Sequence, residues 1–369
     1  MKKAILALLL AGVLSLTGCS SMLEQKYLLD LKPYDPVSSS PGSASLRVET
    51  YQELYRAIHA LVSAGEEHAV LNLYHYSAQD LEADLARACL EVVQNDPLGA
   101  YMVDYIKHDY SLIVSYYEVN INVTYRHTAQ ELDAIVSVTG SSAIRRELRK
   151  TLAKFSTDAV LRVSYFAEDE DHILDLVRQA YYDTPLAAFG MPEATVSLYP
   201  SGGTNRIVEI HLTYPDNQET LRRSSKELKE VAASMVHPED NSQALFDAAT
   251  ATLVIEENTG RSTAYDALIN GVADSEGAAL AYQLLCDQTG VECAIVQGTL
   301  NGEPHFWNII TEDGTLYRHV DLSAKLFSLS DLELTESGAY EWDRAQYPTC
   351  DSPAEEVSDA APEKEISEN

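Results

Sequence analysis

The chain has 369 residues, of which 46% are hydrophobic, so it is long enough for two or three domains with cores of their own. Lys and Arg number 26 and Asp and Glu number 57, which gives a formal net charge of −31 at pH 7. Such a surface argues against nucleic acid as a partner and against electrostatic binding to a membrane surface, because both need basic patches. We interpret the charge as an aid to solubility.

The N-terminal residues indicate a targeting segment. Two lysines precede an apolar run from residue 4 to residue 14, and residues 16–19 read Leu-Thr-Gly-Cys. This order resembles a bacterial lipoprotein signal, in which the chain is cut before the Cys and the Cys is acylated. The resemblance implies a signal peptide at residues 1–18, lipid attachment at Cys19 and an extracytoplasmic, lipid-anchored location on a bacterial membrane. The alternative is an ordinary secretory signal with an incidental Cys.

Two segments are expected to lack a packed fold. Residues 19–45 contain clustered Ser, Pro and Gly, which is typical of a flexible tether. Residues 351–369 carry seven acids and one Lys, which predicts a disordered acidic tail. No other segment of the chain has 18 consecutive apolar residues, so we expect membrane contact through the lipid anchor only.

The region between the tether and residue 235 indicates a duplication. Segments 69–74, 96–100 and 123–125 recur in order at 159–164, 184–188 and 212–214, at offsets of 90, 88 and 89 positions. We therefore expect two α/β repeats, at residues 46–140 and 141–235, each built as helix, strand, helix and hairpin. The expected elements are helices at 51–63, 78–94 and 220–236, strands at 70–76 and 119–125, and a hairpin of 195–199 with 206–214.

The repeats show no catalytic pattern. Their histidines are scattered without metal-ligand spacing, so we predict neither a metal site nor a cofactor there. Four cysteines follow Cys19, and they allow three disulfide connectivities, of which the sequence favours none. Cys286 can pair with Cys293 or remain a buried free thiol. We assign the repeats to spacing, substrate approach or partner contact.

Residues 236–350 carry three segments that together resemble a known family. Residues 271–282 lead into a predicted helix, residues 304–308 read Pro-His-Phe-Trp-Asn, and residues 317–323 read Tyr-Arg-His-Val-Asp-Leu-Ser. Their order and spacing are similar to the core of the bacterial transglutaminase-like superfamily, which belongs with the papain-like cysteine enzymes. The resemblance implies an α+β domain with a helix packed on an antiparallel sheet. In that family the three segments carry the nucleophilic Cys, the His and the Asp, and here these positions hold Ser275, His305 and Asp321.

The predicted elements suggest how His305 and Asp321 meet. A strand at 294–300 turns at 301–302 into a strand at 306–310, which leads through a turn at 313–314 into a strand at 316–322. A two-residue turn would point the two side chains to different faces. A three-residue loop at 312–314, with Gly314 in the left-handed conformation, sets His305 opposite Asp321 on one face, so we predict this loop.

Two interpretations of Ser275 remain open. A helix N-terminus beside a His lowers the pKa of a thiol, but a hydroxyl is far too weak an acid for the same stabilisation to ionise it. Ser275 could work only if a neutral His305 took its proton during attack, as in serine hydrolases. The alternative is that Ser275 is the N-cap of its helix.

Three functions are consistent with the sequence. The first is a degenerate transglutaminase-like domain that is not an active enzyme and binds peptide or cell-wall polypeptide. The second is an active serine variant, an amidase or acyl transferase that uses Ser275, His305 and Asp321. The third is an architectural surface lipoprotein that acts through its duplicated region. None of the three calls for a cofactor or a metal ion.

Overall fold

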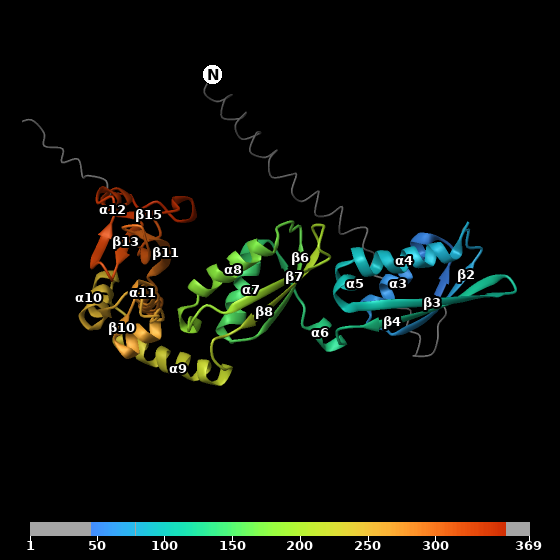
Figure 1. Cartoon of the computed structure of the whole chain (residues 1–369), viewed down its shortest axis with the longest axis horizontal. Coiled ribbons are helices and arrows are strands. Elements are labelled where there is room, and N and C mark those ends of the chain that lie inside the picture. The colour runs from blue at the N-terminus through green and yellow to red at the C-terminus, as the bar shows by residue number, and fades with distance from the viewer. Residues whose placement is uncertain (1–45, 78, 352–369) are drawn as a thin grey trace, which may run out of the picture.

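The computed structural model describes residues 46–77 and 79–351. The predicted signal peptide, the lipid attachment at Cys19, the tether and the tail from residue 352 onwards lie outside these residues. Three bodies follow one another along the long axis, coloured blue to teal, green, and yellow to red in Figure 1. Helices and sheets alternate in each body, so the predicted α+β class is confirmed. Within the described residues, no helix is long and apolar enough to cross a membrane.

The first unit is a four-stranded sheet with helices packed on it. Its strand order is β1-β2-β4-β3, with β1 and β2 parallel and the other neighbours antiparallel. Helix α3 begins where Thr50 and Glu53 form a reciprocal capping box. The elements are β1 (Leu46–Val48), α3 (Tyr51–Ser63), β2 (His68–Tyr74), α4 (Leu81–Asn95), α5 (Pro97–Met102), β3 (Val103–Ile113), β4 (Tyr116–Tyr125) and α6 (Ala129–Asp133).

The second unit repeats this topology. Its strand order is β5-β6-β8-β7, again with the first pair parallel and the others antiparallel. The order of elements along the chain is also the same, which is what a duplication produces. The elements are β5 (Val136–Thr139), α7 (Ser141–Ala153), β6 (Asp158–Ser164), α8 (Glu170–Tyr182), the 3-10 turn η1 (Pro185–Ala187), β7 (Glu193–Tyr199), β8 (Arg206–Thr213) and α9 (Gln218–Met235).

The predicted repeat unit omitted the first strand of each copy, β1 and β5. In the first copy it also omitted strand β3. Strands β1 and β5 have only three and four residues, too few for a visible alternation of apolar and polar side chains. Strand β3 is exposed along most of its length, so it carries no apolar alternation either. Since β5 (from residue 136) belongs to the second sheet, the second unit already includes residue 136, five residues before the expected start at residue 141.

The C-terminal body packs one buried helix on a five-stranded antiparallel sheet. The strand order is β14-β13-β12-β11-β15. Helix α11 contacts β11 and β12 on one face of this sheet. The elements are α10 (Ser242–Thr252), β9 (Val254–Ile255), the π-helical turn η2 (Asp266–Asn270), β10 (Val272–Ala273), α11 (Ser275–Thr289), β11 (Glu292–Leu300), β12 (Glu303–Thr311), β13 (Arg318–Asp321), β14 (Leu326–Leu329), α12 (Asp331–Glu336), β15 (Tyr340–Trp342) and η3 (Arg344–Gln346).

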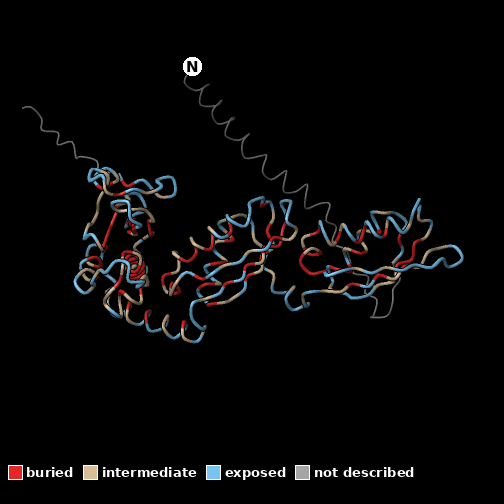
Figure 2. The backbone as a smooth tube through the Cα atoms, in the orientation of Figure 1, coloured by how far each residue is buried: buried red, intermediate tan, exposed pale blue. Residues whose placement is uncertain are grey.

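Helix α11 lies at the centre of the C-terminal body, where Figure 2 shows it as a red coil. It is buried almost all round because its first three turns consist mainly of Ala and Leu. The helix ends at Gly290, which has a φ of +81° and so adopts the left-handed C-cap conformation that glycine favours. The start of α11 is therefore held in a fixed position against the sheet.

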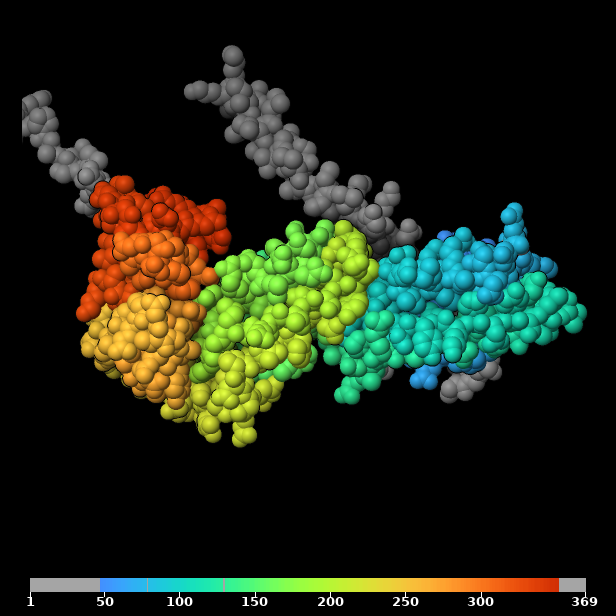
Figure 3. Space-filling view, viewed as in Figure 1, coloured from blue at the N-terminus to red at the C-terminus, as the bar shows by residue number. Residues whose placement is uncertain are grey.

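The second unit and the C-terminal body share one apolar core. A single cluster of buried side chains runs from Ile173 of α8 and Leu228 of α9 to Ala279 and Leu285 of α11. The first unit has its own cluster, to which the second unit contributes Ile207. Figure 3 shows the green and orange bodies in contact along this boundary. The second unit is therefore part of the surroundings of α11.

Candidate functional site

The strands that carry His305 and Asp321 are joined by a longer loop than predicted. In the observed register Asn308 lies opposite Val320 and Ile310 lies opposite Arg318, so the loop spans residues 312–317. The predicted three-residue loop is wrong. The Asp313 carboxylate accepts hydrogen bonds from the N–H groups of residues 315 and 316, at 2.8 and 3.0 Å, which stabilises the wider turn. Gly314 has the predicted left-handed conformation, with a φ of +73°.

The wider loop preserves the alternation, so His305 and Asp321 still share one face of the sheet. They lie diagonally across the two strands, and the His305 Nε2 atom is 2.6 Å from Asp321 Oδ2. Both side chains are buried, with 5% and 2% of their surface exposed. The structure therefore brings together the His and the Asp of the predicted triad.

Asp321 has further hydrogen-bond donors that the sequence did not single out. The Tyr340 hydroxyl donates to Asp321 Oδ2 at 2.7 Å. The Ser323 hydroxyl and the Ala324 N–H both donate to Oδ1, at 2.7 and 3.0 Å. Burial raises the pKa of Asp321. The hydrogen bond and the charge of His305, together with the hydrogen bonds from Ala324 and Ser323, outweigh this effect and lower the pKa overall. Asp321 is therefore held as a carboxylate.

Ser323 does not take the place of the missing thiol. Its hydroxyl lies 3.3 Å from His305 Nε2, the same ring nitrogen that Asp321 contacts. In a hydrolytic triad the nucleophile and the acid bind opposite nitrogens of the imidazole. Ser323 therefore orients Asp321 and His305.

Ser275 is neither the helix cap nor a partner of His305. The N-cap is Asp274, whose carboxylate accepts a hydrogen bond from the Gly277 N–H at 3.0 Å, so the capping interpretation of Ser275 is wrong. Ser275 is the first residue of α11 and only 3% exposed. Among the described residues its hydroxyl has one polar contact, a long one of 3.5 Å to Glu257 Oε2, and no hydrogen bond to His305.

The sheet separates the His305 ring from α11. Along β12, Phe306 and Ile310 pack in the apolar cluster that contains α11, and Asn308 donates to the Ala279 carbonyl of α11 at 3.1 Å. His305 alternates with these residues, and its ring lies 6.0 Å from that of Trp307 and 5.9 Å from that of Tyr340. Trp307 and Tyr340 belong to the cluster on the other face of the sheet. His305 therefore points away from the helix that carries Ser275.

The surroundings of Ser275 are acidic. Asp274 and Glu276 flank it in the chain, and Glu257 is its hydrogen-bond partner. Burial raises the pKa of Glu276 to about 7, the negative Asp274 adds to the rise, and a hydrogen bond from the Tyr182 hydroxyl opposes it. That hydroxyl lies 3.1 Å from Glu276 Oε1 and belongs to α8 of the second unit. Negative charge beside Ser275 disfavours removal of its proton.

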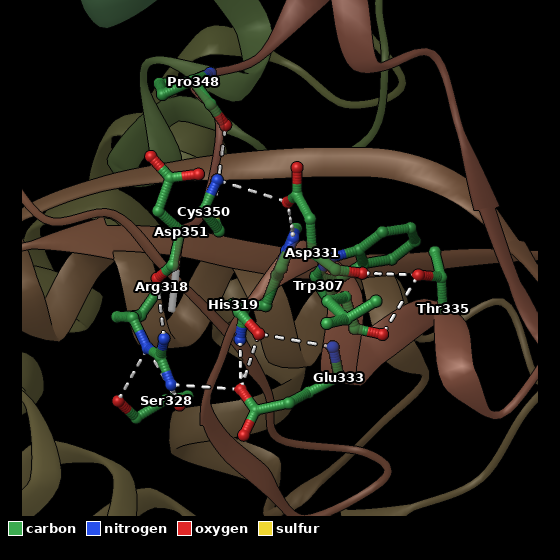
Figure 4. A network of polar contacts seen from close by, with 12 residues as sticks. Trp307, Arg318, His319, Ser328, Asp331, Glu333, Thr335, Pro348, Cys350 and Asp351 are labelled. Atoms are coloured by element: carbon green, nitrogen blue, oxygen red, sulfur yellow. Dashed lines mark hydrogen bonds and ion pairs between the residues drawn. The ribbon is translucent and has the colours of Figure 1, made fainter. Parts of the chain in front are cut away.

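A second polar cluster, drawn in Figure 4, lies on the face of the C-terminal sheet that α11 does not cover. His319, Asp331 and Cys350 place potential metal-ligand atoms within 4.8 Å of one another. The Trp307 indole N–H donates to His319 Nδ1 at 3.0 Å, so the ring proton is on Nε2, which is 2.8 Å from Asp331 Oδ1. A metal ion on Nε2 would move the proton to Nδ1, where it would face the buried Trp307 donor. The cluster therefore fits a hydrogen-bonded anchor for residues 348–351 better than a metal site.

The four cysteines are free thiols in the structure. Cys89, Cys286 and Cys350 are buried, and Cys293 is partly exposed. The Cys293 thiol itself is buried, and this burial is the largest of the causes that raise its pKa. None of the four lies at the start of α11, where the family nucleophile would be.

No protein-family model matches the chain, and no curated protein matches it. Among solved structures, it is similar to a candidate cysteine protease from Cytophaga hutchinsonii, with 13% identity over 43% of this chain and 69% of that chain and a TM-score of 0.23. A structure described as a TGase gives 11% identity over 60% of this chain and 65% of that chain, with a TM-score of 0.25. A candidate protease from Parabacteroides distasonis gives 10% identity over 69% of this chain and 43% of that chain, with a TM-score of 0.20. All three TM-scores lie below 0.5, so these likenesses carry no argument.

Proposed function

We propose that this chain is an extracytoplasmic lipoprotein whose C-terminal domain is a degenerate, transglutaminase-like module. In this proposal the module binds peptide or cell-wall polypeptide without turning it over. The membrane anchor is the lipid on Cys19, and the duplicated units hold the module away from the membrane. The resemblance of the segments around Ser275, His305 and Asp321 supports the assignment of the domain.

The proposal that this module does not turn over its ligand rests on the contact between the Ser275 hydroxyl and Glu257. A serine nucleophile needs a neutral imidazole within hydrogen-bond reach that can take its proton. Ser275 contacts the Glu257 carboxylate instead, and the His305 ring lies on the other face of the sheet. The buried His305–Asp321 hydrogen bond then links the neighbouring strands β12 and β13.

A binding and turnover assay tests the proposal. The full chain in detergent is titrated with uncharged heptapeptides from a display library and with soluble cell-wall peptide fragments, and each mixture is analysed by mass spectrometry after binding is measured. We expect saturable binding and unchanged peptide masses, both in the wild type and in Ser275→Ala. Cleavage or acyl transfer that disappears in Ser275→Ala would establish the serine-enzyme alternative. The absence of any binding would favour the architectural alternative.

A further inference from the structure

A cavity of about 450 Å³ lies between the second unit and the C-terminal sheet. One wall is a single face of α8, formed by Asp175, Arg178, Gln179 and Tyr182 at helical spacing. The other wall is the edge of β11 at residues 294, 295 and 297, and residues 346–348 close one end. The volume lies within the range of about 300–1,000 Å³ that is usual for ligand sites.

The edge of β11 in this cavity has no partner strand. Strand β15 pairs with β11 only from Gly298 to Leu300. The N–H of Asn301 donates to the carbonyl of Ala339, the residue before β15. The N–H of Gln297 faces no strand and donates to the Tyr347 hydroxyl at 3.1 Å. Main-chain groups of alternate residues point to the same edge, so the N–H and C=O of Ile295 also point toward this side. Among the described residues, no hydrogen bond to these two groups is found.

The cavity carries charges that cancel. Arg145 forms a bidentate pair with Asp183 at 2.5 Å. Arg178 pairs with Asp175 and also donates to Gln297 Oε1 at 2.7 Å, which ties α8 to β11. Each Arg is thus neutralised by an Asp, so the lining offers no net attraction to an anion. The remaining lining side chains are three glutamines, two tyrosines and the apolar Ala294, Ile295 and Pro348, which suit an uncharged ligand.

We propose that the free edge of β11 binds an extended, uncharged peptide segment of another protein as an added strand inside this cavity. The Ile295 N–H and C=O bond to the peptide main chain, which is how sheet edges recognise peptides. Alternate peptide side chains then face the polar side of α8. This inference rests on the proposed function, because it names where the peptide binds. The acidic segment 352–369 is a poorer occupant, since the chain already carries a net charge of −31.

The test uses the tightest peptide from the display library and two matched variants of the full chain. Ala294 is exposed and lines the cavity, so Ala294→Trp blocks the edge without removing a buried group. Glu292 is exposed on the same strand but outside the cavity, and Glu292→Trp is the control. We expect binding at least tenfold weaker in Ala294→Trp and within twofold of the wild type in Glu292→Trp. Circular dichroism and the midpoint of urea unfolding check that both variants fold.

N-methylated peptides test the strand geometry. In a scan of single N-methylations, we expect one position to weaken binding at least tenfold and its two neighbours to change it less than twofold, because the free edge offers the peptide one acceptor, the Ile295 C=O. Full binding to Ala294→Trp would place the peptide elsewhere and overturn this inference, while the proposed function would stand. No binding to the wild type would overturn both. Tighter binding after deletion of residues 352–369 would make that segment the natural occupant and refute a partner protein.

Discussion

Glu276 gives the most quantitative prediction, because its carboxyl is partly buried where α8 of the second unit meets the start of α11. Its pKa rises from 4.5 to about 7 in the folded protein. The folded state therefore holds the proton more tightly than the unfolded state between these two pH values. The free energy of unfolding accordingly falls as the pH rises from 4.5 to 7, and it recovers on acidification.

The size of the effect follows from the two pKa values. A difference of about 2.5 in pKa corresponds to about 3 kcal/mol, and partial exposure of the carboxyl reduces it to about 1–3 kcal/mol. The substitution Glu276→Gln keeps an oxygen that can accept the Tyr182 hydrogen bond and removes the charge. We expect this variant to match the wild type near pH 4.5 and to be about 1–3 kcal/mol more stable at pH 8.

Urea unfolding followed by tryptophan fluorescence measures this difference in the free energy of unfolding of the C-terminal body. The chain has two tryptophans, Trp307 and Trp342, and both belong to the apolar cluster on the face of the C-terminal sheet opposite α11. The variant Glu292→Gln, at an exposed position of β11, is the control and should follow the wild type at every pH. If Glu276→Gln also follows the wild type from pH 5 to pH 8, Glu276 is not buried against the second unit and the reasoning is refuted.

Three further predictions concern the site and the sheet. The pH dependence of iodoacetamide alkylation gives the pKa of the thiol introduced by Ser275→Cys. We expect this pKa to be about 8.5 or higher, because acids surround the thiol. A value below about 7 would reveal an ion pair with His305. Tyr340→Phe removes a donor to the buried Asp321 carboxylate and should lower the free energy of unfolding by about 1–3 kcal/mol, and an unchanged urea midpoint would contradict that role. Gly298→Ala would bring a Cβ within 2.3 Å of a main-chain oxygen of β15 and should destabilise the sheet by about 1–3 kcal/mol, whereas Gly202→Ala, with open space around it, should have little effect in the same assay.

Much of the C-terminal domain could be predicted from its sequence. The apolar periodicity after Ser275 predicted α11. Its N-cap, which one interpretation placed at Ser275, is Asp274, and Gly290 forms its C-cap. The pairing of His305 with Asp321 was also correctly expected on one face, although the predicted loop was too short. Successive side chains of a strand alternate between the two faces of the sheet. A register shift of two residues therefore leaves His305 and Asp321 on the same face.

The position of His305 relative to Ser275 could not be predicted in the same way. Both faces of β12 are buried, so the sequence does not reveal which face α11 covers. The burial of Glu276 was also invisible, since its partner Tyr182 lies 94 positions away in the second unit. Such contacts depend on how the units pack, and local patterns carry no information about that packing.

The state of Ser275 decides between a binding module and an enzyme, and a fluorophosphonate probe reports on it directly. The full chain in detergent is incubated with the probe, digested and analysed by mass spectrometry, with Ser275→Ala treated in parallel. We predict no adduct on the peptide that contains Ser275, because Glu257 rather than His305 contacts its hydroxyl. An adduct on Ser275 in the native protein that is absent from Ser275→Ala would contradict the account and establish a serine nucleophile.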